Sequence, residues 1–300
     1  MMTTLRVGLM GAGAVGCFYA GHMAKKGAQV TILTRCPEVY DSPICINSVN
    51  GDFSFTPAAI RSIHEPVDVD VLILATKALP SIDQVALIRP FMSNQTKLMV
   101  IQNGIFVEDD LLKAFQQPIF RCLAFICVSR LSRTQIHHMD FGALSMGCLN
   151  ADLDLFSEDP LIDLLKDLDI PFRLTQRIQQ SIWEKLVWNA PFNPLSVLCG
   201  GLTTEQLLMD SDITARVIAI MKEVQLVATS AGVTITDDFI QQKIEQTRQM
   251  APYKTSMCLD YEAGLAIEVD AILGNLLNYA DQQSVHIPQI YRLYNDLKTL

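Results

Sequence analysis

The chain contains 300 residues, of which 50% are hydrophobic and 18% are charged, a composition that can bury one or two cores and that disordered chains lack. The formal net charge of −9 argues against a nucleic-acid partner, because phosphates are bound by basic surfaces. No apolar run approaches the ~20 residues that a membrane span needs. Because the net charge is negative, a small anionic substrate would have to be bound at a locally positive site.

The amino-terminal residues Met1–Arg6 lead directly into an apolar run and lack the features of a signal peptide. We therefore expect a cytoplasmic protein. The eight cysteines form no Cys-x-x-Cys pair, and no histidine stands at metal-ligand spacing. We expect no metal site and interpret the cysteines as small buried hydrophobic residues.

The first half of the chain alternates aliphatic runs with helical patterns, which predicts a parallel sheet built from βαβ units. We expect strands at 6–10, 29–33, 69–75, 97–101, 119–128, 142–148 and 170–174. Later patterns are helical, with helices expected at 178–188, 204–231, 237–250, 256–280 and from 288 onward. The sequence therefore predicts an α/β first domain over residues 1–176 and an all-helical second domain over residues 177–300.

A glycine-rich turn lies between the first predicted strand and the first predicted helix. Its Gly-x-Gly-x-x-Gly spacing is typical of a Rossmann-type doubly wound sheet that binds a dinucleotide. Gly11 would form the tight turn, Gly13 would let the backbone approach a pyrophosphate, and Gly16 would let helix and strand pack closely. We expect the cofactor to be bound here by Gly11, Ala12, Gly13, Ala14, Val15 and Gly16. The alternative is that the glycines serve only the turn and its packing.

The second predicted strand ends at Thr34-Arg35, about 20 residues after the glycines, where NAD-binding chains usually carry an acidic residue. A guanidinium binds a 2′-phosphate through paired, charge-assisted hydrogen bonds. We therefore expect NADP(H) rather than NAD. The alternative is a solvated surface arginine, and the nearby Glu38 would oppose phosphate binding.

Two further polar segments follow predicted strands. Lys77 follows the strand at 69–75, and Gln102-Asn103-Gly104 follows the strand at 97–101. Ligands of doubly wound sheets bind outside the carboxyl ends of the strands, so we expect Lys77 and Asn103 to contact cofactor or substrate. A solvated loop lysine and a simple Asn-Gly turn are the alternatives.

A predicted helix carries Lys185, Asn189 and Asn193 at intervals of four, which places them on one stripe. An ammonium on an otherwise apolar helix is a reasonable proton donor to a developing alkoxide. The alternative is a lysine whose stem lies along the surface with its head in water. Pro191 removes a backbone donor and should kink this helix.

The predicted helix at 256–280 places Ser256, Asp260, Gly264 and Glu268 at intervals of four. A hydroxyl and a carboxylate would then point to the same side. For Asp260 and also for Asp270, an acidic solvent-exposed face is the alternative.

Taken together, these motifs resemble the ketopantoate reductase family, whose members reduce 2-dehydropantoate to pantoate with NADPH in pantothenate and coenzyme A synthesis. The resemblance spans nearly the whole chain and includes the runs at 183–195 and 256–270, Gly274-Asn275 and the segment at 285–288. It implies a Rossmann domain, a helical domain and an active site in the cleft between them. Domain closure on ligand binding is expected from a two-domain cleft, and the apolar helical half leaves room for a homodimer interface.

The resemblance implies that Lys185 is the general acid and that Glu268 orients substrate hydroxyls and tunes Lys185. It also implies four substrate-binding residues: Asn103, Asn189, Asn193 and Ser256. This chain departs from the family at Leu265, where a basic residue is common, and at Ile267, where a threonine is common. Reduction of another branched 2-keto acid and a non-catalytic NADP-binding sensor are therefore the alternative functions.

Overall fold

A computed structural model describes residues 4–39 and 43–300. The described chain divides into two compact units. The first contains the described residues up to Lys77, together with Ser81–Gln102 and Glu108–Ile178. The second contains Gln179–Leu300 and two short segments from the first half of the sequence, Ala78–Pro80 and Asn103–Val107.

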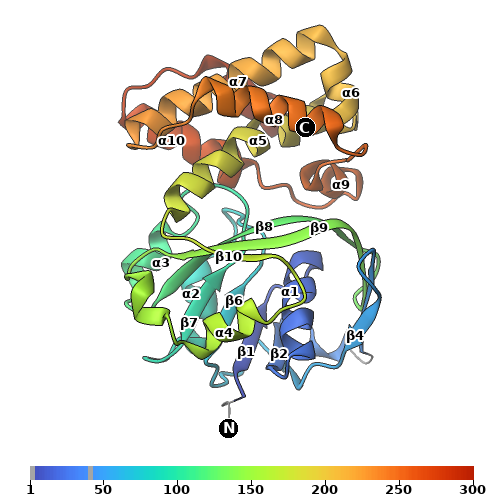
Figure 1. The fold of residues 1–300 in the computed structure, drawn as a ribbon, viewed down its shortest axis with the longest axis vertical. Coiled ribbons are helices and arrows are strands. Elements are labelled where there is room, and N and C mark those ends of the chain that lie inside the picture. Colours follow the sequence, from blue (N-terminus) through green and yellow to red (C-terminus); the bar gives the residue numbers. More distant parts are fainter. Residues whose placement is uncertain (1–3, 40–42) are drawn as a thin grey trace. The chain divides into compact units, whose positions relative to one another are not determined.

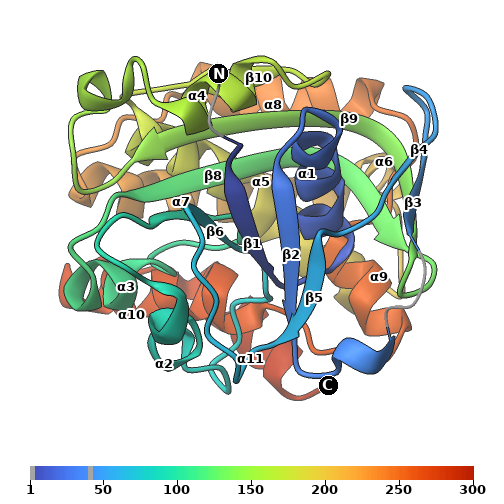
Figure 2. The same ribbon diagram turned by 90° about the horizontal axis from the view of Figure 1, so that it is seen from below.

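The first unit is built on a mixed sheet. Its described strands follow the order β4-β3-β9-β8-β7-β6-β1-β2-β5, and β10 pairs with β9 (Figure 2). The strands are β1 (Arg6–Met10), β2 (Gln29–Thr34), β3 (Ile44–Ser48), β4 (Phe53–Phe55), β5 (Ala59–Ser62), β6 (Val71–Leu74), β7 (Lys97–Val100), β8 (Ile119–Arg130), β9 (Gln135–Cys148) and β10 (Phe172–Leu174). The central strands are aliphatic because both faces of the sheet are covered there.

The sheet departs from the predicted parallel pattern at two pairs of strands. The pairs β8–β9 and β3–β4 are antiparallel, while the remaining pairs are parallel. Only a few residues separate β8 from β9, and a connection that short permits antiparallel pairing but no crossover. The sequence analysis missed β3, β4 and β5, because short strands with polar residues give a weak periodic signal.

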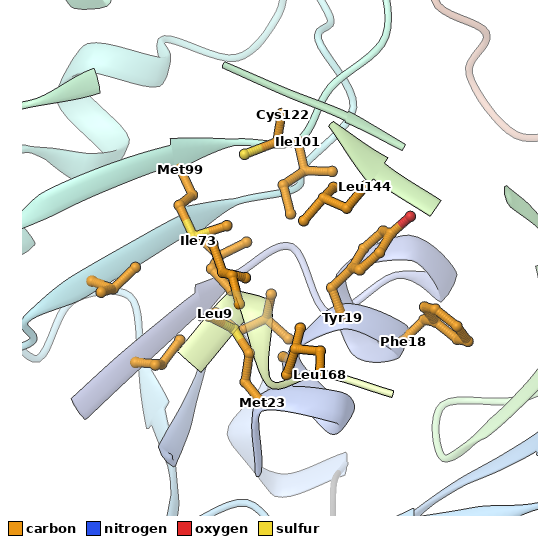
Figure 3. Packing of buried hydrophobic residues seen from close by; sticks show 14 of the residues in the cluster. Leu9, Phe18, Tyr19, Met23, Ile73, Met99, Ile101, Cys122, Leu144 and Leu168 are labelled. Carbon is orange, nitrogen blue, oxygen red and sulfur yellow. The ribbon is translucent and has the colours of Figure 1, made fainter. Parts of the chain in front are cut away.

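Helix α1 (Ala14–Lys25) supplies much of the first core (Figure 3). Its Phe18, Tyr19 and Met23 lie among Leu9 of β1 and Ile73 of β6, and all five side chains are buried. The other helices of this unit are α2 (Gln84–Ile88), α3 (Asp109–Ala114) and α4 (Pro160–Lys166), with 3₁₀ turns η1 (Pro37–Val39), η2 (Arg89–Phe91) and η3 (Leu153–Phe156). This core holds the strand ends in place.

The regular elements among the described residues of the second unit are all helices or helical turns (Figure 1). Its elements are α5 (Ile178–Leu198), α6 (Thr204–Met209), α7 (Ser211–Ser230), α8 (Asp237–Gln249), α9 (Ser256–Glu262), the π-helical turn η4 (Asp270–Gly274), α10 (Asn275–Gln282) and α11 (Pro288–Lys298). The carboxylate of Glu223 accepts the N–H groups of Gln289 and Ile290 at 2.8 Å each and so caps α11. The two units confirm the predicted fold class.

Two predicted helices are broken in the structure. The helix expected at 204–231 is interrupted at Asp210, whose extended backbone ends α6 and whose carboxylate caps α7. The helix expected at 256–280 ends at Glu262, because Gly264 adopts a left-handed conformation with φ +66°. By contrast, α5 continues through Pro191 without interruption.

No helix in the described part of the chain is long and apolar enough to cross a membrane. The same residues contain no group of three His, Cys, Asp or Glu side chains suited to a metal ion.

Candidate functional site

The glycine-rich turn of the first unit has the geometry that its spacing predicts. Gly11 has φ +96°, and a Cβ atom there would collide with the backbone of Ala75 and Thr76. A Cβ atom on Gly16 would collide with the carbonyl oxygen of Gly11. These two glycines are therefore required by the packing of the turn itself.

Gly13 differs from its neighbours, because a Cβ atom there would meet no described heavy atom within 4 Å. Gly13 precedes α1, and no side chain caps the N–H groups of that helix. An open approach to the backbone and an uncapped helix N-terminus are what a pyrophosphate needs. The turn from Gly11 through Ala12 to Gly16 therefore fits a dinucleotide.

Four strand ends of the first unit lie at one edge of the sheet. Met10 of β1 pairs with Leu33 of β2 and with Leu74 of β6, and Leu74 pairs in turn with Val100 of β7. Residues 11, 35, 75 and 101 therefore follow parallel strands that lie side by side. This register gathers the polar segments that the sequence analysis selected.

Arg35 and Lys77 both follow strands at this edge. Arg35 comes directly after β2 and is exposed, whereas Lys77 is half-buried in the loop after β6. The Gln102 amide nitrogen donates to the carbonyl oxygen of Thr76 at 2.8 Å and so joins two of the strand ends. Because β2 pairs with β1, Arg35 follows β2 at the same edge of the sheet at which the glycine turn follows β1.

A buried ion pair, missed by the sequence analysis, supports Gln102. The Arg121 guanidinium donates to the Gln102 carbonyl oxygen at 2.8 Å, and its Nε lies 3.4 Å from Oε2 of Glu108. Both side chains are almost fully buried, where each charge needs a partner. An arginine within the apolar run of β8 was the available signal.

In the second unit, Lys185 and Asn103 are in direct contact. Nζ of Lys185 on α5 donates to Oδ1 of Asn103 at 3.1 Å, although 82 residues separate them. The Lys185 side chain is half-buried. The amide oxygen accepts one of the three protons of the ammonium and so orients it.

Glu268 is held by a backbone group. Its Oε1 accepts the N–H of Ala78 at 2.9 Å, across 190 residues of sequence. Ala78 directly follows Lys77, and the side chain of Glu268 is half-buried. A backbone N–H donor is present at almost every position of a chain, so no sequence pattern could have identified this contact.

Asn189 and Asn193 share a face of α5 with Lys185, because the helix is continuous from Ile178 to Leu198. Asn189 is 7% exposed and Asn193 is 3% exposed. Buried amides are costly unless they are hydrogen-bonded. The two amides of this stripe are therefore polar groups that are largely removed from solvent.

Ser256 does not share a helical stripe with Glu268. It is exposed at the first residue of α9, and the left-handed Gly264 separates α9 from the turn that follows Glu268. Ser256 and Asp260 share a face of α9, but the interval of four has no meaning across the break at Gly264. The predicted alignment of these two residues with Glu268 is therefore wrong. Asp270 is instead paired with Tyr294 and Lys298.

Comparison with known proteins adds sequence and fold similarity to this geometry. Residues 7–151 match the family model for ketopantoate reductase PanE/ApbA, and residues 177–300 match the model for its C-terminal part. The chain is 31% identical over 307 residues to a 2-dehydropantoate 2-reductase of Nostoc sp., with 100% of this chain and 96% of that protein covered.

Solved structures show the same similarity. The crystal structure of 2-dehydropantoate 2-reductase from Methylococcus capsulatus matches with a TM-score of 0.87 and 33% identity, covering 98% of this chain and 96% of that one. The ternary structure of D-mandelate dehydrogenase with NADH and anilino(oxo)acetate matches with a TM-score of 0.88, covering 98% and 97% of the two chains. Its identity of 18% makes that likeness one of fold alone.

Proposed function

The chain belongs to the ketopantoate reductase family, and from this premise we propose that it reduces 2-dehydropantoate to pantoate with NADPH, a step of pantothenate and coenzyme A synthesis. One observation carries the proposal: the ammonium of Lys185 is oriented by Oδ1 of Asn103 at 3.1 Å. Reduction of a ketone needs a proton at the oxygen as hydride reaches the carbon. Lys185 is the group proposed to supply it.

The first unit would bind the cofactor. When bound, NADPH supplies the hydride. The open backbone at Gly13 and the N-terminus of α1 would bind the pyrophosphate, and Arg35 would bind the 2′-phosphate. Lys77 and Asn103 are proposed as further contacts to the cofactor.

The second unit would bind the substrate and manage its charge. Negative charge develops on the carbonyl oxygen during reduction, and a fixed ammonium stabilises that charge best where water is excluded. The buried amides of Asn189 and Asn193, together with Asn103 and Ser256, are proposed to bind the carboxylate, carbonyl and hydroxyl groups. Glu268, fixed by the N–H of Ala78, would orient the substrate hydroxyl groups.

One feature favours a second substrate. Leu265 and Ile267 stand where the family commonly has a basic residue and a threonine, and Leu265 is 56% exposed. An apolar side chain in place of a cation would favour a more apolar, branched 2-keto acid. We therefore keep reduction of such an acid as the alternative to 2-dehydropantoate.

The test is a substrate panel. Purified protein is mixed with NADPH and either 2-dehydropantoate or one of its branched 2-keto acid analogues, and loss of NADPH absorbance is followed. The highest kcat/KM is expected for 2-dehydropantoate, since specificity is a ratio of these values. A higher value for an analogue would favour the alternative substrate. NADPH binding by calorimetry without turnover of any keto acid would contradict both and indicate a sensor.

A further inference from the structure

We propose that Asn275 is a positioning residue for the reaction, which holds the segment Asn103–Ile105 so that Asn103 meets Lys185. The inference rests on the proposed function for its kinetic consequence, but the contacts that carry it are those of the second unit alone. Four elements contribute: the segment Asn103–Val107, the π-helical turn η4, α10 and α5.

The turn η4 has an irregular hydrogen-bond pattern. The N–H of Asn275 donates to the carbonyl oxygen of Asp270, five residues back. In an α-helix the same N–H would donate to Ala271, four residues back. The carbonyl oxygen of Ala271 instead accepts the N–H of Ile105 at 3.0 Å. The irregular turn thus provides an acceptor for a segment far away in the sequence.

The backbone of the segment Asn103–Val107 closely approaches the backbone of η4. Gly104 has φ +100°, and a Cβ atom there would collide with the carbonyl group of Ala271. Only glycine permits both this conformation and this contact. The segment therefore lies directly on η4, with no side chain between the two backbones.

The side chain of Asn275 holds the same segment through a hydrogen bond. Its Nδ2 donates to the carbonyl oxygen of Ile105 at 2.8 Å. Ile105 is 2% exposed, and both of its backbone groups are now bound, one by Ala271 and one by Asn275. Two residues earlier, Asn103 accepts the hydrogen bond from Lys185. The position of Asn103 therefore depends on how firmly Ile105 is held.

Aromatic packing supports the same segment from its other end. Phe106 has φ +57°, a conformation that is unfavourable for its residue type and that surrounding contacts must maintain. Its ring centroid lies 4.8 Å from that of Tyr279 on α10 and 6.1 Å from that of Trp183 on α5. Trp183 precedes Lys185 by two residues, so the helix that carries the ammonium also packs against the segment.

Loss of the Asn275 side-chain amide should change the position of Asn103. Without the Asn275 amide, the carbonyl group of Ile105 loses its buried donor, and the segment gains freedom to move away from α5. A small displacement of Asn103 misorients the Lys185 ammonium, and misplacements of about 1 Å can cost up to about 10²-fold in rate. The contacts that the glycine turn and Arg35 of the first unit are proposed to make with NADPH would not change.

The experiment compares five variants of the protein with wild type. Asn275→Leu removes the donor at similar size, and Asn275→Asp replaces the donor with an acceptor and serves if the leucine variant folds poorly. Asn278→Leu is the matched control, because Asn278 is an exposed asparagine on the same helix. Asn103→Ala, alone and combined with Asn275→Leu, tests whether Asn275 acts through Asn103.

We expect kcat to fall about tenfold in Asn275→Leu, with a much smaller effect on KM for NADPH, because Asn103 is only one of several proposed cofactor contacts. In the Asn103→Ala background the same substitution should have almost no further effect, since the contact that it supports is already lost. Exchange of the Ile105 amide hydrogen, measured by NMR, should be about tenfold faster in Asn275→Leu and unchanged in Asn278→Leu.

An unchanged kcat, or an equal loss in the presence and absence of Asn103, would overturn the proposal. So would a rise in KM for NADPH with kcat unchanged, or unchanged exchange at Ile105. If the wild-type protein reduces no 2-keto acid, the proposed function fails on its own, and the exchange measurement still decides whether Asn275 holds the segment.

Discussion

The glycine turn of the first unit and the Lys185 contacts of the second unit are organised in different ways. The turn consists of consecutive residues, and its geometry follows from where a Cβ atom fits at Gly11, Gly13 and Gly16. The contacts of Lys185 with Asn103 and of Glu268 with Ala78 join residues 82 and 190 positions apart. A local motif can therefore be recognised from spacing, whereas the proposed proton donor depends on the whole helical unit. Substitutions in the two regions should have separable effects on cofactor binding and on turnover.

The largest effect is expected at Lys185. Lys185→Ala should lower kcat by about 10³-fold, because general acid catalysis typically contributes 10² to 10⁴-fold. The Kd for NADPH, measured by calorimetry, should change little. Lys222→Ala, at a half-exposed lysine of α7, is the control and should keep full activity. Retention of most of kcat in Lys185→Ala would remove this residue from the mechanism.

The glycine turn gives a paired prediction. Gly16→Ala should destabilise the fold by about 1–3 kcal/mol, since the added methyl collides with the Gly11 carbonyl oxygen. Gly13→Ala should leave the melting temperature close to that of wild type but weaken NADPH binding at least about tenfold, because the methyl projects where the pyrophosphate would bind. Thermal unfolding and calorimetry of both variants measure the difference. If Gly13→Ala binds NADPH normally, the backbone at this position does not approach the cofactor.

Arg35 should affect the choice of cofactor rather than turnover. Arg35→Ala removes a charge-assisted contact worth about 1.5–3 kcal/mol and should weaken NADPH roughly tenfold or more. NADH, which lacks the 2′-phosphate, should bind this variant and wild type equally well. Titration of both nucleotides into both proteins measures the effect. An equal loss for the two would place Arg35 away from the 2′-phosphate.

The same contrast explains what could be predicted from the sequence. The central strands and α5 follow from hydrophobic periodicity, and the glycine turn follows from its spacing, because these features depend on neighbouring residues. The stripe from Ser256 to Glu268 was wrong because a repeat of four continues in the sequence even where Gly264 ends the helix. Gly264 itself was the available signal for that end.

Other contacts of the candidate site could not be predicted from the sequence. The N–H of Ala78 donates to Glu268, and the carbonyl oxygen of Ala271 accepts the N–H of Ile105. Both are backbone groups, and the types of residue in a sequence do not indicate how such groups pair. Asn275 belongs to a Gly-Asn pair that the sequence analysis connected with the family without giving it a role. Its contact with Ile105 spans 170 residues and becomes visible only in the structure.

The smallest predicted effect is on the pH dependence of the free energy of unfolding, and it arises from a histidine of α1, the helix that follows the glycine turn. His22 of α1 is 7% exposed, and its ring packs against Phe18 and Phe53 at centroid distances of 4.7 Å. Burial lowers the pKa of His22 to about 4, and the nearby Lys25 ammonium acts in the same direction. Its Nδ1 has no hydrogen-bond partner among the described residues, so a proton there would be unsatisfied.

Because the folded pKa lies below the unfolded value of about 6.5, only the unfolded state binds a proton between these values, and stability falls as the pH drops through that window. The free energy of unfolding should decrease by about 1 kcal/mol between pH 7 and pH 5.5 on account of His22. Denaturant unfolding of wild type and His22→Leu at both pH values measures this, and the variant should lose that part of the pH dependence. His64→Leu changes an exposed histidine and should retain it. An equal slope in wild type and His22→Leu would show that His22 is as easily protonated in the folded chain as in the unfolded one.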